Sequence, residues 1–595
     1  MTKIGIMRKN NIIKTWLPVV LMAIFTASCA KDEITYLEAD IYDTDDDIAN
    51  TTFDRTVYVE FSTSGDATVS GASSDDMSVT VSGNDVTIVN SGDEVVMYVL
   101  SGTTTDGFFK LYSTRKQGIT LNGANITNKN GAAINVQGTT SEPNKGKRTF
   151  IVVNSDNSLA DGTSYTGTPD NEDEKAALFS EGQLIFSGTG SLAVTATGKS
   201  GIVSDDYIRI SSDLTLNVSS TAGHGIKTND FIAISSGTIG IAVTADTKKG
   251  MNTDGYVSIS GGDISINVTG GTAYDSEDGE YKGSAGIKAD GYFKISGGNL
   301  AITNSGTGGK GISSDSTGSF TGGTITVTTT GSNYGSSGGG GNNPPTPPGM
   351  KNSDDDSSVS AKAIKFDGDL TFSGAKVTVN CTAHEGIESK SALNITAGEV
   401  YSYSAADDAI NSGGDMTITG GYVCGYATSN DGLDANGDCH IKGGVVYAIG
   451  SSSPEVAIDA NTEQNKQLYV EGGTIVAIGG LEQGSSLTQS CYSASSWSAN
   501  TWYGLTIGST IYAFKTPTSG GTPLVVSGSS TPTLQSDVTT SGGTEHFEGI
   551  FIENTTISGG TSVSLSSYSG GNGGGQPGGG GNQSGGGNGH GGGPF

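Results

Sequence analysis

Apolar and polar residues alternate along most of the chain in short runs, and Gly, Asp or Asn stands between one run and the next. The stretch from Gly250 to Val268 is typical: two apolar positions alternate with polar ones, Ser-Gly-Gly follows, and three more apolar positions alternate again. A period of two predicts β-strands, and Gly, Asp and Asn favour tight turns between them. The pattern therefore predicts short strands joined by corners.

The same unit recurs, and each copy carries one aliphatic anchor residue at the same place. The anchors are Leu178, Ile202, Ile226, Met251, Ile287, Ile312, Ile364, Ile387, Ile410, Leu433 and Ile458. Most are 23–25 residues apart, and two spacings are 36 and 52. Stacking such units at ~4.8 Å buries the inward Ile and Val side chains in one column. We predict an all-β chain that forms a parallel β-helix of about 11 or more coils, with three short strands in each coil, an N-terminal β cap and a C-terminal β extension. The alternative is a propeller, but each of its blades needs about 40 residues, so a unit of 23–25 residues is too short for it.

Interruptions of the repeat give the domain boundaries. The β-helix is predicted for residues 51–480, with insertions at corners over 138–174, 272–283 and 331–360. Residues 481–565 are expected to form an aromatic loop and the β extension, and 566–595 a disordered glycine-rich tail. The 94 glycines therefore fall into two groups. Those within the repeat turn its corners, and those in the tail have no apolar residues nearby to pack against.

The N-terminal residues have the pattern of a targeting signal. Basic residues precede an apolar run over 16–25, and small residues then lead to Cys29. This pattern is typical of a signal peptide, here 1–28, and resembles a bacterial lipobox with Cys29 as the lipidated residue. Residues 29–50 are predicted to be a solvated acidic tether that includes Asp43 and Asp45 to Asp47. Lys31-Asp32-Glu33 resembles the signal that sends some lipoproteins to the outer face of the outer membrane. We therefore expect the protein to be located there and to be held at the membrane by its N-terminal lipid alone.

The net charge, the hydropathy and the lack of catalytic motifs exclude several classes of function. The 61 acidic residues against 31 basic ones give a net charge of -30, which argues against nucleic-acid binding. The single long apolar stretch lies at the N-terminus, so a polytopic membrane protein is excluded. No Ser/His/Asp or paired-carboxylate motif stands out, and we expect a monomeric protein that is not an enzyme.

Several ordered motifs carry a resemblance to a known family. They are Tyr98-Val99-Leu100-Ser101-Gly102-Thr103, Asp106-Gly107, Gly118-Ile119-Thr120-Leu121-Asn122-Gly123, Asn130-Gly131-Ala132-Ala133-Ile134, Glu385-Gly386-Ile387-Glu388-Ser389-Lys390, Asp407-Asp408-Ala409-Ile410-Asn411 and Asn430-Asp431-Gly432-Leu433-Asp434-Ala435-Asn436-Gly437. Over residues 85–565 the chain resembles a bacterial family of extracellular carbohydrate-binding right-handed parallel β-helices. The resemblance implies binding of plant cell-wall polysaccharides such as cellulose and polygalacturonate, bound Ca²⁺, and a fold akin to pectate lyases.

Acidic residues form two columns in the second half of the repeat. Glu385, Asp408 and Asp431 lie two residues before their anchors, and Glu388, Asn411, Asp434 and Asp459 lie one residue after theirs. Stacked carboxylates ~4.8 Å apart repel by about 1 kcal/mol per pair in water and about 3–4 kcal/mol at an effective dielectric of 20. Oxygen ligands without His or Cys favour Ca²⁺ over Zn²⁺. The alternative is a solvated acidic edge with raised pKa values. Lys390, next to these acids, is either a base for β-elimination or a balancing charge.

Aromatic residues predict a sugar-binding surface. Trp497, Trp502 and Tyr503 lie after the last clear coil, and Tyr401 and Tyr447 share an outward column. Such rings stack on the C–H faces of sugars. The outward stripe is either a ligand surface or is covered by residues 505–565.

These features together predict a surface lipoprotein that binds acidic or β-linked polysaccharides, with Ca²⁺ assisting the site or the fold. The alternatives are a calcium-dependent enzyme like pectate lyase and a structural adhesin without catalytic activity.

Overall fold

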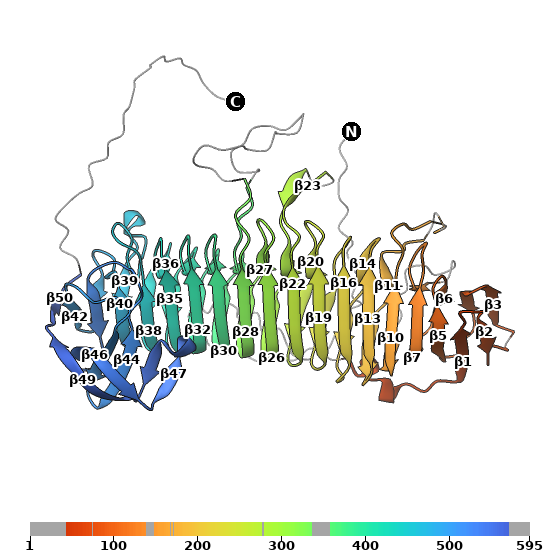
Figure 1. Cartoon of the computed structure of the whole chain (residues 1–595), viewed down its shortest axis with the longest axis horizontal. Coiled ribbons are helices and arrows are strands. Elements are labelled where there is room, and N and C mark those ends of the chain that lie inside the picture. Colours follow the sequence, from red (N-terminus) through yellow and green to blue (C-terminus); the bar gives the residue numbers. More distant parts are fainter. Residues whose placement is uncertain are drawn as a thin grey trace, which may run out of the picture.

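The computed structural model describes residues 43–73, 75–138, 148–166, 168–169, 172–276, 279–335 and 358–570. The predicted signal peptide, Cys29 and most of the tether, most of the 331–360 insertion and the tail after residue 570 lie outside this part. The described chain is an elongated tube whose strands run across its long axis (Figure 1). The all-β prediction is confirmed.

Two large sheets form the wall of the tube. The main sheet has 28 strands, and the second sheet has 14. The strands of the second sheet are β3 (Met77–Ser82), β4 (Asp85–Asn90), β6 (Phe108–Ser113), β8 (Ile134–Gln137), β11 (Ala176–Ser180), β14 (Ser200–Ser204), β17 (Ile226–Thr228), β20 (Lys249–Thr253), β25 (Ala285–Ala289), β27 (Lys310–Ser314), β29 (Ile364–Phe366), β31 (Ile387–Ser389), β33 (Ile410–Ser412) and β36 (Leu433–Ala435).

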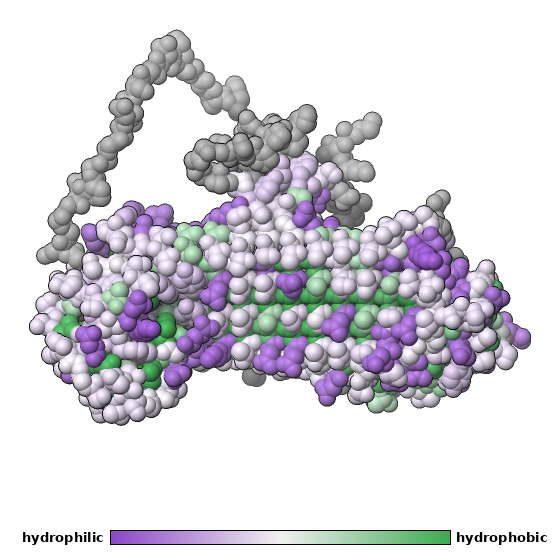
Figure 2. Space-filling view, in the orientation of Figure 1, coloured by the Kyte–Doolittle hydropathy of each residue, from purple (hydrophilic) through white to green (hydrophobic). Residues whose placement is uncertain are grey.

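Equivalent residues of successive repeats pair in parallel. Ile226 pairs with Met251, Met251 with Ile287, and Ile287 with Ile312. Every one of these anchors is fully buried. Figure 2 shows the consequence on the face in view, where apolar and polar rows alternate as stripes along the tube. The predicted repeat and its anchor column are therefore present.

The predicted right-handed parallel β-helix, with three separate short strands in each coil, needs correction. In the middle of the tube the strands β26 (Phe293–Asn304), β28 (Gly318–Thr329), β30 (Leu370–Cys381) and β32 (Leu393–Ser404) are each 12 residues long. They run through the predicted Ser-Gly-Gly corner, where the register shifts mark a bulge, and Gly298 takes a φ of 79°. Two predicted faces are thus one continuous sheet, which closes with the second sheet around a single core.

The ends of the tube are built from the same sheets. At the N-terminal end, β1 (Arg55–Phe61) pairs in parallel with β5 (Val96–Thr104), and β4 pairs with β6, so these strands belong to the wall rather than to a separate cap. At the other end, β45 (Leu524–Ser527) joins the main sheet antiparallel to β40 (Thr474–Ile478). A further sheet of six antiparallel strands, the C-terminal sheet, lies against the flank (blue in Figure 1). Its strands are β43 (Trp502–Ile507), β44 (Thr510–Lys515), β46 (Thr533–Ser541), β47 (Thr544–His546), β48 (Phe551–Glu553) and β49 (Thr556–Val563).

Residues 43–50, the described part of the predicted acidic tether, are mostly exposed as expected, but one residue anchors them to the tube. Two short 3-10 helices, η2 (Thr44–Asp46) and η3 (Ile48–Asn50), bring Asp46 against the tube, where only 4% of it is exposed. Its carboxylate accepts hydrogen bonds from Nε of Arg148 at 2.7 Å, Nε of Arg209 at 2.8 Å and Oη of Tyr207 at 2.7 Å. No helix in the described part of the chain is long and apolar enough to cross a membrane.

Close stacking of the repeats makes one glycine column sensitive to substitution. A Cβ added at Gly286 would lie 2.4 Å from Cγ2 of Ile302 and 2.7 Å from the carbonyl oxygen of Gly311. We expect Gly286→Ala to lower the free energy of unfolding by about 1–3 kcal/mol, because the core must shift to accept the methyl group. Urea unfolding measures the effect. Gly65→Ala is the control, since its nearest atom would be Oγ of Ser62 at 3.9 Å. Equal midpoints for both variants would contradict the proposed packing.

Candidate functional site

The outer surface of the second sheet, which we name the charged face, carries the polar columns of the repeat. Residues one place after each anchor point outward, because neighbouring residues of a strand point to opposite faces. In register these residues are Lys227, Asn252, Lys288, Ser313, Lys365, Glu388, Asn411 and Asp434. A second column, two places before the anchors, contains Lys249, Ala285, Lys310, Lys362, Glu385, Asp408 and Asp431. All seven predicted metal ligands belong to these columns or, for Asp459, to their continuation.

Two of the predicted ligands have a basic partner. Nζ of Lys362 lies 3.2 Å from Oε2 of Glu385 and 2.7 Å from Oε2 of Glu388. The side chains of all three residues are largely buried. Lys362 therefore supplies the positive charge that these carboxylates need, and they stand apart from the other predicted ligands.

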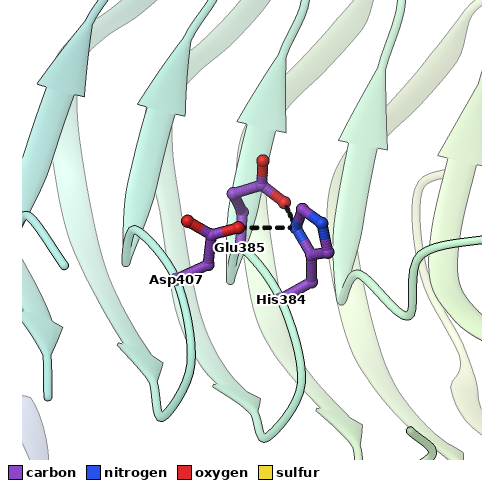
Figure 3. A group of neighbouring side chains, drawn as sticks. All are labelled: His384, Glu385 and Asp407. Carbon is purple, nitrogen blue, oxygen red and sulfur yellow. Dashed lines mark hydrogen bonds and ion pairs between the residues drawn. The ribbon is translucent and has the colours of Figure 1, made fainter. Parts of the chain in front are cut away.

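Glu385 also takes part in a group that the sequence did not reveal. Nδ1 of His384 contacts Oε2 of Glu385 and lies 3.0 Å from Oδ2 of Asp407 (Figure 3). Burial opposes ionisation of Asp407, but hydrogen bonds from His384 and Asn430 outweigh it and lower the pKa of its carboxyl. One ligand atom from each of His384, Glu385 and Asp407 lies within 4.8 Å of the others. The histidines share no spacing in the repeat, so their positions gave no signal for this group.

The remaining predicted ligands form a contiguous acidic cluster of Asp408, Asn411, Asp431, Asp434 and Asp459. Ligand oxygens of Asp431, Asp434 and Asp459 lie within 4.8 Å of one another. Nδ2 of Asn411 donates to Oδ2 of Asp408 at 3.0 Å and to Oδ2 of Asp434 at 3.2 Å. Within the described residues, no Lys, Arg or His lies at ion-pair distance from the four carboxylates.

The electrostatics of the acidic cluster follow from this lack of a cation. Burial, reinforced by the charges of Asp434, Asp407 and Asp431, raises the pKa of Asp408 to about 8. Burial likewise raises the pKa of Asp431 to about 7, although a backbone hydrogen bond from Val456 opposes the shift. Burial also raises the pKa values of Asp434 and Asp459. A set of carboxylate and amide oxygens with no basic partner fits a hard cation such as Ca²⁺.

The charged face also contains a cleft that sequence reasoning missed. Its volume is about 770 Å³, and its floor is formed by β17, β20, β25, β27 and β29. A hairpin of β23 (Ala273–Asp275) and β24 (Glu280–Lys282), which projects from the tube in Figure 1, lines it together with residues 358–360. We name it the lysine cleft for its lining lysines: Lys227, Lys248, Lys249, Lys282, Lys288, Lys310, Lys362, Lys365 and Lys390. The sequence does contain a signal for this cleft, because most of the floor lysines occupy the same two columns of the repeat as the acidic residues.

The predicted sugar-binding aromatics are mostly inaccessible, which corrects that prediction. Tyr447 is fully buried, Tyr503 is 2% exposed and Tyr401 9% exposed, because all three pack beneath or within the C-terminal sheet. Oη of Tyr447 donates to the carbonyl oxygen of Lys515 at 2.7 Å. Trp497 and Trp502 are half-buried, and Nε1 of Trp497 donates to the carbonyl oxygen of Gly521 at 2.9 Å. The outward stripe is thus covered by the chain, the second of the two alternatives.

Two other residues were predicted from the sequence to have a function, Lys390 and Cys29. Nζ of Lys390 lies 3.1 Å from Oδ1 of Asp367, so this lysine balances a neighbouring acid at the end of the cleft. Cys29, the predicted lipid anchor, lies outside the described residues.

A family model described as "Carbohydrate-binding domain-containing protein" matches residues 82–278 and 213–432. The chain belongs to this carbohydrate-binding family. The matched residues contain the whole floor of the lysine cleft together with Asp408 and Asp431, and they end before the C-terminal sheet.

A solved structure of the polysaccharide lyase-like protein from C. thermocellum, a gadolinium derivative, is similar at 22% identity and a TM-score of 0.31. That similarity covers 46% of this chain and 92% of the other. No curated protein matches the chain.

The raised pKa values predict an unusual pH dependence of stability in the absence of metal. An unfolded Asp releases its proton near pH ~4, whereas Asp408 and Asp431 hold theirs to about 8 and about 7. Between these values the folded state binds more protons, so the free energy of unfolding falls as pH rises from about 4 to about 8 and then levels. We expect Asp431→Asn to make this fall shallower in urea unfolding with EDTA. Glu60→Gln, at an exposed site, is the control. An identical pH profile for Asp431→Asn and the native protein would refute the assignment.

Proposed function

We propose that the protein binds polysaccharides, without cleaving them, along the charged face of the tube. The observation that carries the proposal is the position of the family match: residues 82–432 include the open cleft on this face but exclude the C-terminal sheet. Membership of a carbohydrate-binding family therefore points to the tube wall, and an open polar cleft of about 770 Å³ lies on this side.

The geometry of the charged face suits a polymer. Its residues repeat at the spacing of stacked strands, ~4.8 Å, so similar groups are presented many times along one direction. A polysaccharide also repeats one unit along a line, and several weak contacts of the same kind then add up along the chain. The buried positions of Tyr401, Tyr447 and Tyr503 make an aromatic platform at those residues unsuitable for this role.

We also propose that the acidic cluster holds Ca²⁺. Asp431, Asp434 and Asp459 would supply carboxylate oxygens, with Asp408 and Asn411 beside them. A bound divalent cation would neutralise the stacked carboxylates and offer a positive centre to hydroxyl or carboxylate groups of a glycan. Asn411 bridges Asp408 and Asp434 and so keeps both carboxylates in place.

The place of action is proposed from the N-terminal sequence. A signal peptide, Cys29 as the lipid-bearing residue and the acidic residues that follow favour a lipoprotein on the outer surface of the outer membrane. The anchored segment at Asp46 would then be the point where the tether meets the tube.

Affinity electrophoresis tests polysaccharide binding. We expect slower migration of the full chain in gels that contain a soluble cellulose derivative or polygalacturonate than in plain gels, because bound glycan retards the protein. The same samples are analysed for shortened or unsaturated glycan. Unchanged mobility with every glycan would end the proposal, and release of unsaturated products would favour the lyase alternative.

Calcium binding is tested by its effect on thermal unfolding. Because binding to the folded state alone stabilises it by about 2.7 kcal/mol at a hundredfold excess over Kd, added Ca²⁺ should raise Tm at pH 8. The rise should be smaller at pH 5, where protons compete for Asp408 and Asp431. Asp434→Asn should reduce the Ca²⁺ effect, and Glu60→Gln should leave it intact. A Ca²⁺ effect that persists fully in Asp434→Asn would place the ion elsewhere.

A further inference from the structure

The lysines of the cleft floor follow a regular alternation. Along four successive strands, one lysine of the two columns stands in each repeat, and it changes from one column to the other each time. The order is Lys227 on β17, Lys249 on β20, Lys288 on β25 and Lys310 on β27. The next repeat has a lysine in both columns, Lys362 before β29 and Lys365 within it. The floor therefore offers at least one lysine for each step of ~4.8 Å along the tube.

These lysines differ in whether an acid balances them. Nζ of Lys288 lies 3.1 Å from Oδ1 of Asp290, and Nζ of Lys365 lies 2.6 Å from Oδ1 of Asp367. For Lys227, Lys249 and Lys310, no carboxylate within the described part of the chain lies at ion-pair distance. In a protein with a net charge of -30, cations without an acidic partner on one face are unexpected.

Lys249 and Lys310 flank a gap in the same column. Ala285 pairs in register with Lys249 on one side and with Lys310 on the other. Two strand spacings, ~9.6 Å, separate the two lysine backbones, and the small Ala side chain leaves room between their ammonium groups. The gap opens into the lysine cleft, which is lined by all three residues.

The surroundings strengthen the positive potential at this gap. Burial, and then the charges of Lys248, Lys282 and Lys288, lowers the pKa of Lys249 to about 8, although Asp275 opposes the shift. Burial, and then Lys365, Lys362 and Lys249, lowers the pKa of Lys310 to about 8, although Glu388 opposes it. The ring of His224 accepts a hydrogen bond from the backbone N–H of Lys249 at 3.1 Å. An anion between the two ammonium groups would relieve this mutual repulsion.

An aromatic residue at the cleft wall fits the same ligand. Tyr281, on the hairpin, lines the cleft, and its ring lies 5.3 Å from that of Tyr274 and 5.1 Å from that of Tyr334. Tyrosine rings bind the C–H faces of sugars, and cationic side chains bind their acidic substituents. The cleft therefore combines both kinds of contact that an acidic sugar needs.

We propose that Lys249 and Lys310, on either side of Ala285, form a binding subsite for the carboxylate or sulfate groups of an acidic polysaccharide, and that this subsite works without Ca²⁺. The inference rests on the proposed function, since it names the ligand class and the residues of the same face. It is separate from the acidic cluster, where an anionic glycan would need a cation between itself and the protein.

The test is affinity electrophoresis of the full chain in EDTA with polygalacturonate, dextran sulfate and a neutral cellulose derivative. We expect Lys249→Gln combined with Lys310→Gln to weaken binding to the anionic glycans roughly tenfold or more, because two charge-assisted contacts are lost. Binding to the neutral glycan should not change. The Lys→Arg pair should retain anion binding, and Lys442→Gln, at an exposed site away from the cleft, is the matched control. Thermal unfolding of each variant shows that it is folded.

The outcomes separate the two proposals. Equal binding of anionic glycans by the native protein and the Lys→Gln pair in EDTA would overturn the subsite and leave the proposed function standing. Binding of anionic glycans only when Ca²⁺ is present, or binding of neutral glycan alone, would also overturn the subsite. No binding of any glycan would overturn the proposed function itself. A preference for polygalacturonate or dextran sulfate distinguishes carboxylate from sulfate as the natural group.

The subsite also predicts how binding depends on pH. Both lysines must be protonated to hold an anion, so their charge is present below pH 8 and is lost as pH rises through about 8. Affinity for dextran sulfate, which stays charged throughout, should therefore fall between pH 7 and pH 9. The Lys→Arg pair should lose this dependence, because arginine stays protonated. A flat profile in the native protein would contradict the assignment.

Discussion

The parallel pairing of equivalent residues in successive repeats is the constraint on which the rest of the structure depends. Each anchor pairs in register with the next, as Met251 does with Ile287, and burial of the anchors fixes that register. Backbone hydrogen bonds hold the strands ~4.8 Å apart whether their outward side chains attract or repel one another. A residue type that recurs at one place in the repeat is therefore stacked into a column. The core supplies the stability that allows such columns to carry like charges.

The charged face shows what this constraint produces. The same two columns carry lysines from Lys227 to Lys365 and mainly acids from Glu385 onward. At the boundary, Lys362 pairs with Glu385 and Glu388. Further apart the two halves do not neutralise each other, because Lys310 and Asp431 are four strand spacings apart, ~19 Å, beyond the ~8 Å over which salt screens charges. Although Lys288 and Lys365 pair with neighbouring aspartates, Lys249 and Lys310 in one half and the acidic cluster in the other have no counter-charge at ion-pair distance among the described residues.

The sequence predicted the parts of this structure that depend on local pattern. Period-two alternation and spacing placed the anchors, and the anchors placed Asp408, Asp431 and Asp434 on one outward face. The parts that depend on distant partners could not be predicted. Asp46 meets Arg148 and Arg209 only after the chain has folded back. Tyr447 is buried by a sheet that begins more than fifty residues later. The sequence around Gly298 predicts the end of a strand, whereas pairing with the strands of neighbouring repeats turns this corner into a bulge within one long strand. The lysine columns are hard to recognise in the sequence for another reason: the net charge of -30 conceals a local excess of positive charge.

The insertion between Met251 and Ile287 shows how the fold adds specificity without disturbing the stack. It leaves Met251 and Ile287 in register and projects as a hairpin beside the lysine cleft. Its own charges engage one another, since Nζ of Lys282 lies 3.3 Å from Oδ2 of Asp275 and 3.8 Å from Oε1 of Glu280. The hairpin can therefore wall the cleft and present Tyr281 while leaving Lys310 without a carboxylate partner among the described residues. A wall that placed acids at ion-pair distance from the floor lysines would neutralise them, and the subsite proposed at Lys249 and Lys310 would then lose its positive potential.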